Sequence, residues 1–446
     1  MTSPEWSSLL NLYQQTVGAG VLQYLEQQTG LRHKRGVYSI AVVVWLMMLQ
    51  RLHGRGTLAS GVQMLLEGAA EPLLYPCRRV RRKRISGRTG GYCQARQKLP
   101  KLVCRQVSQE LVERLRTVLN SAQPEGSANV FVLDGSSLEL EHTRPLVRLY
   151  PPAQNQHGQG HWPVLRVVVL HDVETGLAQQ PCWGPMYGPD AVSEQELAQQ
   201  GMDSLPPRSV VMGDRNFGIF SIAYAAQQRG LQVLLRLTEV RARKLAGPLS
   251  QPGEQRLNWK ASRWDSGGKH RRLPSEAALE GRLIAARVGR GKSKQWLCLF
   301  TTLELPAEEI LQLYARRWNI ETDLRSLKRT VRLHHISAKS PDMLEKELLL
   351  AVSAYNLVRA VMCMAARRSR IDPRQLSFTH VLTVVDHAWP KLIAAPTRKQ
   401  HDKEFLRVLD MAAQCTLPKR PKHRSYPRLL WRRGGLSSFR KADKTK

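Results

Sequence analysis

From residue 129 onward the chain alternates short apolar runs with helical stretches, and this alternation limits the possible folds more than any other feature. Phe220 opens a stretch with a helical pattern, and it lies between two of the apolar runs. Strands mixed with helices in this order predict an α/β unit built on one sheet. The runs with the length and composition of buried strands are residues 130–133, 164–170, 209–212 and 231–237.

Residues 1–125 carry mainly helical patterns. The most apolar stretch, residues 40–49, reaches about half the length that a bilayer span needs, so it predicts a buried helix. The start of the chain carries Glu5 and no basic stretch, unlike a secretion signal. We therefore expect a soluble cytoplasmic protein with no membrane partner.

Charge indicates the partner. The chain has 68 Lys and Arg against 36 Asp and Glu, a formal net charge of +32. A field of this size attracts polyanions, and nucleic acid is the commonest one, although ribosomal and membrane-surface proteins are also basic. A cluster between Arg78 and Arg88 favours phosphate contact over a merely solvated loop.

Two further segments flank or interrupt the α/β unit. Residues 239–300 are polar and basic, and 283–288 with 296–302 predict a β-hairpin around a basic tip. After Pro306 a long helical pattern begins. The tail at 416–446 holds eleven Lys and Arg against one Asp, and either tracks phosphates or remains flexible.

Two aspartates follow apolar runs directly. Asp134 ends the sequence VFVLD and Asp214 ends SVVMGD. Functional groups gather at the carboxyl ends of strands in open α/β sheets, and a charge placed there needs compensation, for which a metal is one source. The alternative is structural: Asp134 with Gly135 makes a turn, and Asp214 caps the next helix.

The helical pattern after Pro306 adds a third acid, Glu321. At about 100° per residue, its polar face falls within an arc of about 80°. A surface helix with an ion pair between Glu321 and Arg325 would explain the charges alone. The face brings together one carboxylate, a phenol and three cations: Glu321, Tyr314, Arg317, Arg325 and Lys328.

The spacing of these residues resembles a known signature. Tyr314, Arg317, Glu321 and Lys328 follow the Y-(2)-R-(3)-E-(6)-K pattern of bacterial DDE transposases of the insertion-sequence-four family. The sequences LDGSS at 133–137 and GDRNFG at 213–218 are similar to the surroundings of the other two acids. ARQKLP at 95–100, the Tyr355-Asn356-Leu357 stretch and the basic tail around 427–428 resemble further family features.

The resemblance implies a fold and a set of domains. We expect an RNase H-like α/β catalytic domain at 126–370 with a β-rich insertion at 239–300. A helical DNA-binding region at 1–125 would precede it, and a basic C-terminal region at 371–446 would follow it.

It also implies an activity. Asp134, Asp214 and Glu321 would be catalytic and would bind two Mg²⁺ ions, for which Mn²⁺ can substitute. The reaction would be cut-and-paste transposition by phosphodiester hydrolysis and strand transfer at terminal inverted repeats. The partners would be double-stranded DNA, both transposon ends and target, and a second copy of the chain in a homodimer.

The remaining implied contacts are to DNA. Tyr314, Arg317, Arg325 and Lys328 would contact phosphates. A tryptophan of the insertion, Trp259 or Trp264, would stack on a flipped base if a hairpin forms on the transposon end, whereas Trp296 is expected in the core.

Two alternatives remain open at the level of the sequence. One is an RNase H-like nuclease without transposition, and the other is a catalytically silent or domesticated sequence-specific DNA-binding protein.

Overall fold

The computed structural model describes residues 36–418 with gaps at 55, 121–128, 156–157, 263–264, 269–270, 290–294, 335 and 396. It also describes scattered positions between 13 and 30 and the backbone of two C-terminal strands, β12 (Arg428–Arg433) and β13 (Leu436–Lys441), which form a hairpin.

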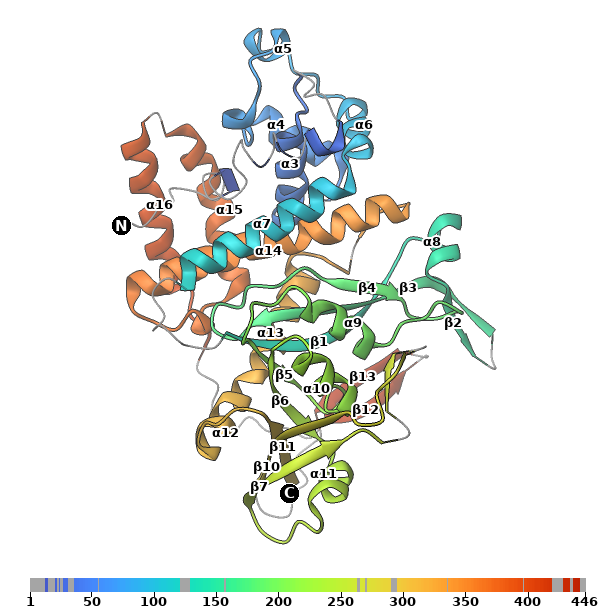
Figure 1. Cartoon of the computed structure of the whole chain (residues 1–446). Helices are drawn as coiled ribbons and strands as arrows, with labels where there is room; N and C mark the ends of the chain where they lie inside the picture. Colours follow the sequence, from blue (N-terminus) through green and yellow to red (C-terminus); the bar gives the residue numbers. More distant parts are fainter. Residues whose placement is uncertain are drawn as a thin grey trace.

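One large mixed sheet forms the centre of the structure (Figure 1). Its strands run in the order β2-β3-β1-β5-β6-β11-β10-β7, and β4 pairs with β3. The strands are β1 (Val130–Glu139), β2 (Pro152–Asn155), β3 (Gly158–Asp172), β4 (Cys182–Pro185), β5 (Val210–Gly213), β6 (Gln232–Leu237), β7 (Gly253–Lys260), β10 (Ala278–Val288) and β11 (Gln295–Thr301).

Pairing directions divide this sheet. β1, β5 and β6 are parallel to one another, and β3 lies antiparallel to β1. β11, β10 and β7 extend the sheet beyond β6 as antiparallel strands, and the predicted hairpin between β10 and β11 is present. The prediction of a mixed α/β unit with one sheet is confirmed. A small separate pair, β8 (Ser266–Gly268) and β9 (Arg271–Arg272), lies between β7 and β10 in sequence.

Helices cover both faces of the sheet, because alternate strand residues are apolar on each face. Along β1, Phe131 and Leu133 enter a core shared with Leu197, whereas Val132 enters a second core shared with Ile320. The first face carries α9 (Glu194–Met202), α10 (Phe220–Gln227) and α11 (Glu239–Ala246). The second carries α12 (Ala307–Ala315), α13 (Asn319–Arg325), α14 (Pro341–Ser369) and α7 (Lys101–Asn120).

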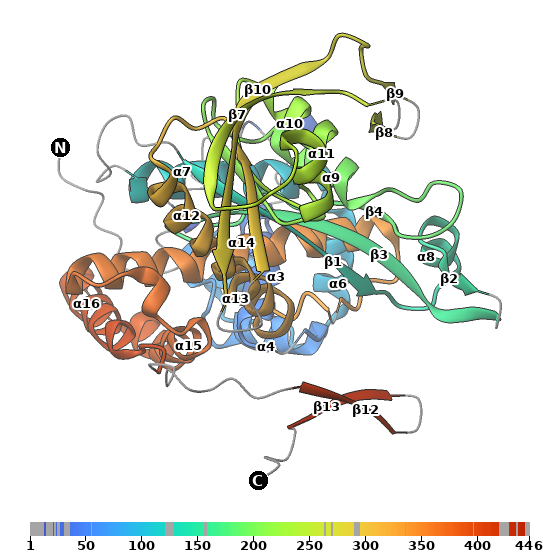
Figure 2. The same ribbon diagram turned by 90° about the horizontal axis from the view of Figure 1, so that it is seen from below.

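The remaining helices are α3 (Ile40–Leu52), α4 (Leu58–Leu66), α5 (Arg78–Arg81), α6 (Gly90–Lys98), α8 (Arg144–Leu149), α15 (Phe378–Ala394) and α16 (Arg398–Gln414). Of these, α3, α8, α15 and α16 contact α14, and α4 and α6 pack against α3. Figure 2, from below, shows α15 and α16 at one end of α14 and α3 with α4 nearer its middle. α3 is buried almost throughout, as its apolar sequence predicts.

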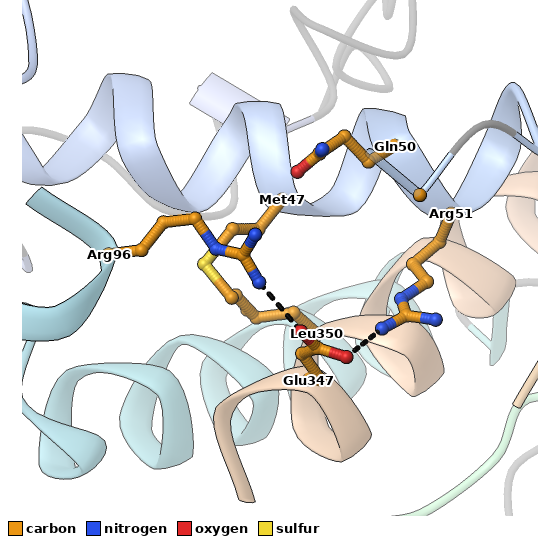
Figure 3. Close-up of a pocket in the computed structure, with 7 residues that line it drawn as sticks. Met47, Gln50, Arg51, Arg96, Glu347 and Leu350 are labelled. Atoms are coloured by element: carbon orange, nitrogen blue, oxygen red, sulfur yellow. Dashed lines mark hydrogen bonds and ion pairs between the residues drawn. The ribbon is translucent and has the colours of Figure 1, made fainter. Parts of the chain in front are cut away.

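A buried ion-pair cluster joins the N-terminal helices to α14 (Figure 3). Glu347 of α14 accepts hydrogen bonds from Arg51 of α3 and from Arg96 of α6, the second at 2.6 Å. The three side chains line a cavity of about 10 Å³ with Gln50 and Met47. A space of this size holds at most about one water, so the cluster joins helices and forms no ligand site.

α14 is long and apolar enough to cross a membrane by composition, but 94% of its most apolar window is buried inside the protein. It is therefore the central core helix. Ser340 caps its start by accepting from the Met343 amide, and Arg370 ends it in the left-handed conformation, at φ 54°.

The long helical pattern predicted after Pro306 is confirmed, but the helix is irregular. The segment divides into α12, a 3-10 turn η3 (Arg316–Trp318), α13 and a π-helical turn η4 (Ser326–Thr330). Tyr314 and Lys328 consequently do not share one straight helical face. Single π-helical turns occur frequently at functional sites.

Candidate active site

Asp134 lies in the middle of a strand, not at its end. β1 continues to Glu139, and Asp134 pairs with Val169 of β3. On the other side of β1, however, the parallel pairing with β5 stops at Val132 and Met212. Asp134 therefore lies just beyond the point where β5 leaves the sheet, and Asp134-Gly135 makes no turn, contrary to the structural alternative.

Asp214 follows the end of β5 directly, as its sequence predicts. Its carboxylate accepts a 2.8 Å hydrogen bond from the Asn216 amide, which closes a turn. It does not cap α10, because that helix starts at Phe220 after Ile219 with no side-chain cap. The two aspartates thus lie side by side at the edge of two neighbouring parallel strands.

The two carboxylates affect each other. Burial raises the pKa of Asp134 to about 6, and the negative charge of Asp214 adds to the rise. A hydrogen bond from the Gly135 amide, at 2.8 Å, and the Arg317 guanidinium act in the opposite direction. In the protein alone, the Gly135 amide and Arg317 therefore do not fully offset the cost of burying the charged Asp134 carboxylate.

Glu321 lies on α13, and Arg317 interacts with both Glu321 and Asp134. The Arg317 guanidinium is 3.9 Å from the Glu321 carboxylate, and the same guanidinium interacts electrostatically with Asp134. The ion-pair partner of Glu321 is therefore Arg317 and not Arg325, which is exposed. Within the described part of the chain, no three acidic, histidine or cysteine side chains are close enough together to hold a metal ion.

Tyr314 is buried at the same place. Its side chain is 6% exposed and its ring is 6.0 Å from the Arg317 guanidinium. Burial raises the pKa of Tyr314, with Arg317 and Arg236 acting against that rise and Asp214 adding to it. Lys328 approaches from η4 and donates a 2.6 Å hydrogen bond to the Ser136 hydroxyl. Arg317 thus lies near Asp134, Tyr314 lies near Arg317 and Asp214, and Lys328 contacts the strand that carries Asp134, whereas Arg325 faces solvent.

Among the tryptophans of the predicted insertion, Trp259 differs from its expected role. Trp259 is 4% exposed and packs edge-on against Phe220 and Phe300, at 5.6 and 4.9 Å between ring centroids. A ring at that depth is part of the core, which corrects its assignment to base stacking. Trp264 lies outside the described residues. Trp296 is 7% exposed under the Arg287 guanidinium, as expected of a core residue.

Trp318 is an exposed residue next to Arg317 for which the sequence predicts no role. It lies in η3 directly after Arg317, and its side chain is 53% exposed.

A buried ion pair fixes α13 and was also missed. Arg374 donates two hydrogen bonds to Asp323, at 2.7 and 2.6 Å, and one to the Asp172 carbonyl at 2.7 Å. Asp172 and His171 are both buried at the end of β3. Asp323 is two residues from Glu321, so this pair ties the acid-bearing helix to β3.

The pattern around Asp323 offered a signal. Asp323 falls on the apolar face of α13 with Ile320, Leu324 and Leu327, which are all buried. An acid on a buried stripe requires a partner, although nothing local identifies Arg374 as that partner.

Glu194 is a further acid beside the site. It is half-buried at the first position of α9, and it contributes to the raised pKa of Asp134, as the last of its causes. Its sequence predicts a helix start, which is correct, but its contacts extend to the turn after β5.

Comparison with known proteins agrees with this geometry. A family model described as "Transposase DDE domain" matches residues 125–357, just over half of the chain, and this segment contains Asp134, Asp214 and Glu321. The transposase InsG for insertion sequence element IS4 of Escherichia coli (strain K12) is 25% identical over 319 residues, which cover 68% of this chain and 67% of that relative.

Among solved structures, the piggyBac transposase synaptic complex with hairpin DNA is similar at a TM-score of 0.44 and 9% identity, over 94% of this chain and 87% of that one. The family match and the curated relative establish the identity. The chain belongs to the DDE transposases, and the resemblance to the insertion-sequence-four family carried by its Y-R-E-K spacing is confirmed.

Proposed function

We propose that this transposase excises a DNA element at terminal inverted repeats and joins it elsewhere, using Asp134, Asp214 and Glu321 as its catalytic acids. The observation that carries the proposal is the proximity of Asp134 to both Asp214 and the Arg317 guanidinium, which is also paired with Glu321. The strand order β4-β3-β1-β5-β6 around them, with only β1, β5 and β6 parallel, supports an RNase H-like catalytic domain at 126–370.

The three acids are suited to Mg²⁺ or Mn²⁺. Their donors are hard carboxylate oxygens, which these ions prefer, and the repulsion between Asp134 and Asp214 is relieved by a bound cation. Two bound ions would activate the attacking oxygen and stabilise the leaving oxygen of an in-line displacement at phosphorus. Glu321 would have to release Arg317 to act as a ligand, which leaves the guanidinium free to bind a phosphate.

The cations around the acids would position the DNA. Arg317 and Lys328 lie beside Asp134 and Ser136, so their charges can hold a scissile phosphate in register. Arg325 would contact phosphates further along the strand. We assign base stacking during hairpin formation to the exposed Trp318 in place of Trp259, with Trp264 as the other candidate.

A basic groove near the N-terminus is the proposed DNA-binding surface of residues 1–125. This groove has a volume of about 780 Å³ and is lined by Arg78, Arg79, Arg88 and Lys98, with no acidic residue among its described lining residues. Gly90 and Gly91 begin α6 at its wall, where helix amide groups favour anions. Arg78→Gln with Arg79→Gln should weaken DNA binding more than Arg82→Gln with Arg84→Gln, since neither of these lines the groove.

Pairing two element ends requires two copies of the chain, so we propose a homodimer on DNA in the bacterial cytoplasm, at the nucleoid. A domesticated, silent protein is the weaker candidate because all three acids are retained.

Excision and joining test the proposed function. Purified protein is incubated with Mg²⁺, a plasmid carrying the DNA that flanks its own gene, and a target plasmid, and the products are sequenced. The account expects discrete cleavage at inverted-repeat boundaries and joined ends in the target. Cleavage without joining would indicate a nuclease, and binding without cleavage would indicate the silent protein.

A further inference from the structure

Glu194 lies at the start of α9 but does not cap it. The cap is complete without it: Ser193 accepts a hydrogen bond from the Glu196 amide, and the Glu196 carboxylate accepts from the Ser193 amide at 2.8 Å. The Glu194 carboxylate is therefore available for contacts outside its own helix.

Those contacts begin at β1. A Cβ built on Gly135 would lie 2.8 Å from the Glu194 carboxyl carbon, so any side chain at this position would force the carboxylate to shift. Side chains alternate along a strand, and Leu133 faces the α9 side whereas Val132 faces the α13 side. Gly135 therefore faces α9 and Glu194, and Asp134 faces α13 and Glu321.

The same carboxylate also binds the turn after β5. Its Oε2 accepts a 2.5 Å hydrogen bond from the Asn216 side-chain amide, while the Asn216 backbone amide donates to Asp214 at 2.8 Å. The neighbouring Gln195 side chain donates to the Asn216 carbonyl and side-chain oxygens, at 3.0 and 2.9 Å. The first turn of α9 thus holds the Asp214 turn at Asn216 and lies against β1 at Gly135.

We propose that Glu194 is a positioning residue of the active site, which holds the Asp214 turn against β1 through Asn216 and Gly135. Asp214 has left the sheet, so no strand pairing fixes its distance from Asp134, and the two like charges repel. A connection outside the acid pair is needed to keep both carboxylates ready for one cation. This inference rests on the proposed function of Asp134 and Asp214.

Two substitutions of Glu194 distinguish the loss of its hydrogen-bond acceptor from the loss of its negative charge. Glu194→Ala removes both, whereas Glu194→Gln keeps an oxygen acceptor for Asn216 and loses only the charge. Glu308→Ala is the matched control, because Glu308 is an exposed acid in the first turn of α12 and experiences the same helix-end field. Gly135→Ala displaces the Glu194 carboxylate without altering it.

Manganese binding to the full chain without DNA, followed by the paramagnetic signal of free Mn²⁺, gives a readout independent of turnover. Glu194→Ala should weaken binding about 10- to 100-fold, as losses of supporting hydrogen bonds around metal sites do. Gly135→Ala should weaken it likewise, and Asn216→Ala should add little to Glu194→Ala. Glu194→Gln should restore most of the binding, and Glu308→Ala should match the wild type.

Two results would overturn the proposal. The first is a folded Glu194→Ala variant that binds Mn²⁺ as tightly as the wild type. The second is a Glu194→Gln variant that binds Mn²⁺ as weakly as Glu194→Ala, because the Glu194 carboxylate would then act as a metal ligand. Circular dichroism and thermal unfolding of each variant confirm the fold. The Asp134→Asn variant distinguishes failure of the proposed function from failure of the positioning role. If it leaves metal binding and DNA cleavage intact, the proposed function fails; if it abolishes both while Glu194→Ala is silent, only the positioning role fails.

Discussion

The Lys328 ammonium group lies 2.6 Å from the Ser136 hydroxyl, and this hydrogen bond joins the turn after α13 to the strand that carries Asp134. Ser136 is two residues beyond Asp134 on β1, so both side chains lie on the same face. The bond places a fixed cation next to the acids.

Lys328→Ala should lower DNA cleavage more than Ser136→Ala does. The first change removes the cation expected to bind a phosphate, whereas the second only frees it to move. A single-turnover cleavage assay checks this, with the exposed neighbour Arg329→Ala as the control. Equal losses for Lys328→Ala and Arg329→Ala would show that general charge, and not this position, matters.

Asp134→Asn should stabilise the metal-free protein. The pKa of Asp134 is about 6 against an ordinary 3.8, so above pH 6 the folded state contains a charge that it disfavours. At pH 7 the free energy of unfolding should rise by roughly 1–3 kcal/mol, partial exposure reducing the effect. As pH falls from 6 towards 4, the folded wild type takes up the proton and the gain should disappear. Urea unfolding at both pH values measures it, and destabilisation at pH 7 would contradict the account.

Asp323→Ala should destabilise the protein strongly. Burial alone would raise the pKa of Asp323, but Arg374 and Arg359 hold it below its usual value, so the acid stays charged. Removing one partner of a buried pair leaves the other charge unpaired, which costs about 3–5 kcal/mol. Urea unfolding checks the loss. Asp323→Leu with Arg374→Leu should be less destabilising than the sum of the single changes, and additivity would argue against a direct pair.

His171 should make the protein sensitive to acid. Burial lowers its pKa from 6.5 to about 4, so the unfolded state binds a proton in this window and the folded state does not. Stability should therefore fall as pH decreases from 6.5 to 4, by about 3 kcal/mol from this group. His171→Phe, which retains a ring against Tyr355, should flatten that part of the stability profile. An unchanged slope would exclude His171 as the cause.

Substitution of Trp259 should affect the stability of the protein, whereas substitution of Trp318 should affect its reaction with DNA. Trp259→Ala should cost about 3–5 kcal/mol of unfolding free energy, because its ring fills the core. Trp318→Ala should change stability by less than about 0.5 kcal/mol, as exposed substitutions do. If Trp318 stacks on a base, its loss should instead weaken hairpin formation on end DNA, by about 1–3 kcal/mol. Normal hairpin formation by Trp318→Ala would rule out that role.

Much of the fold could be predicted because it depends on local patterns. The short apolar run at 130–133 and the apolar run at 40–49 form the buried strand and helix that they predict. The extension of β1 to Glu139 could not be predicted, because pairing with β3 overrides the polar residues after Leu133. The 3-10 and π-helical turns on either side of α13 have no signal in the helical pattern of the sequence.

The residue types of the site and their spacing along the chain could be predicted, but their arrangement in space could not. Asp134, Asp214, Arg317 and Tyr314 do converge. The roles of Glu194 and Arg374 depend on contacts with residues 22 and 51 positions away, and no local pattern encodes such distances.

The most direct test of the central claim is metal-dependent nicking of DNA that carries the ends of the element. Wild type, Asp134→Asn, Asp214→Asn, Glu321→Gln and the control Glu308→Gln are compared in Mg²⁺ and in Mn²⁺. The account predicts nicking at a discrete boundary by wild type and Glu308→Gln, and its loss in the three other variants while DNA binding persists. Undiminished nicking by any one of those three would contradict the assignment of Asp134, Asp214 and Glu321 as the catalytic acids.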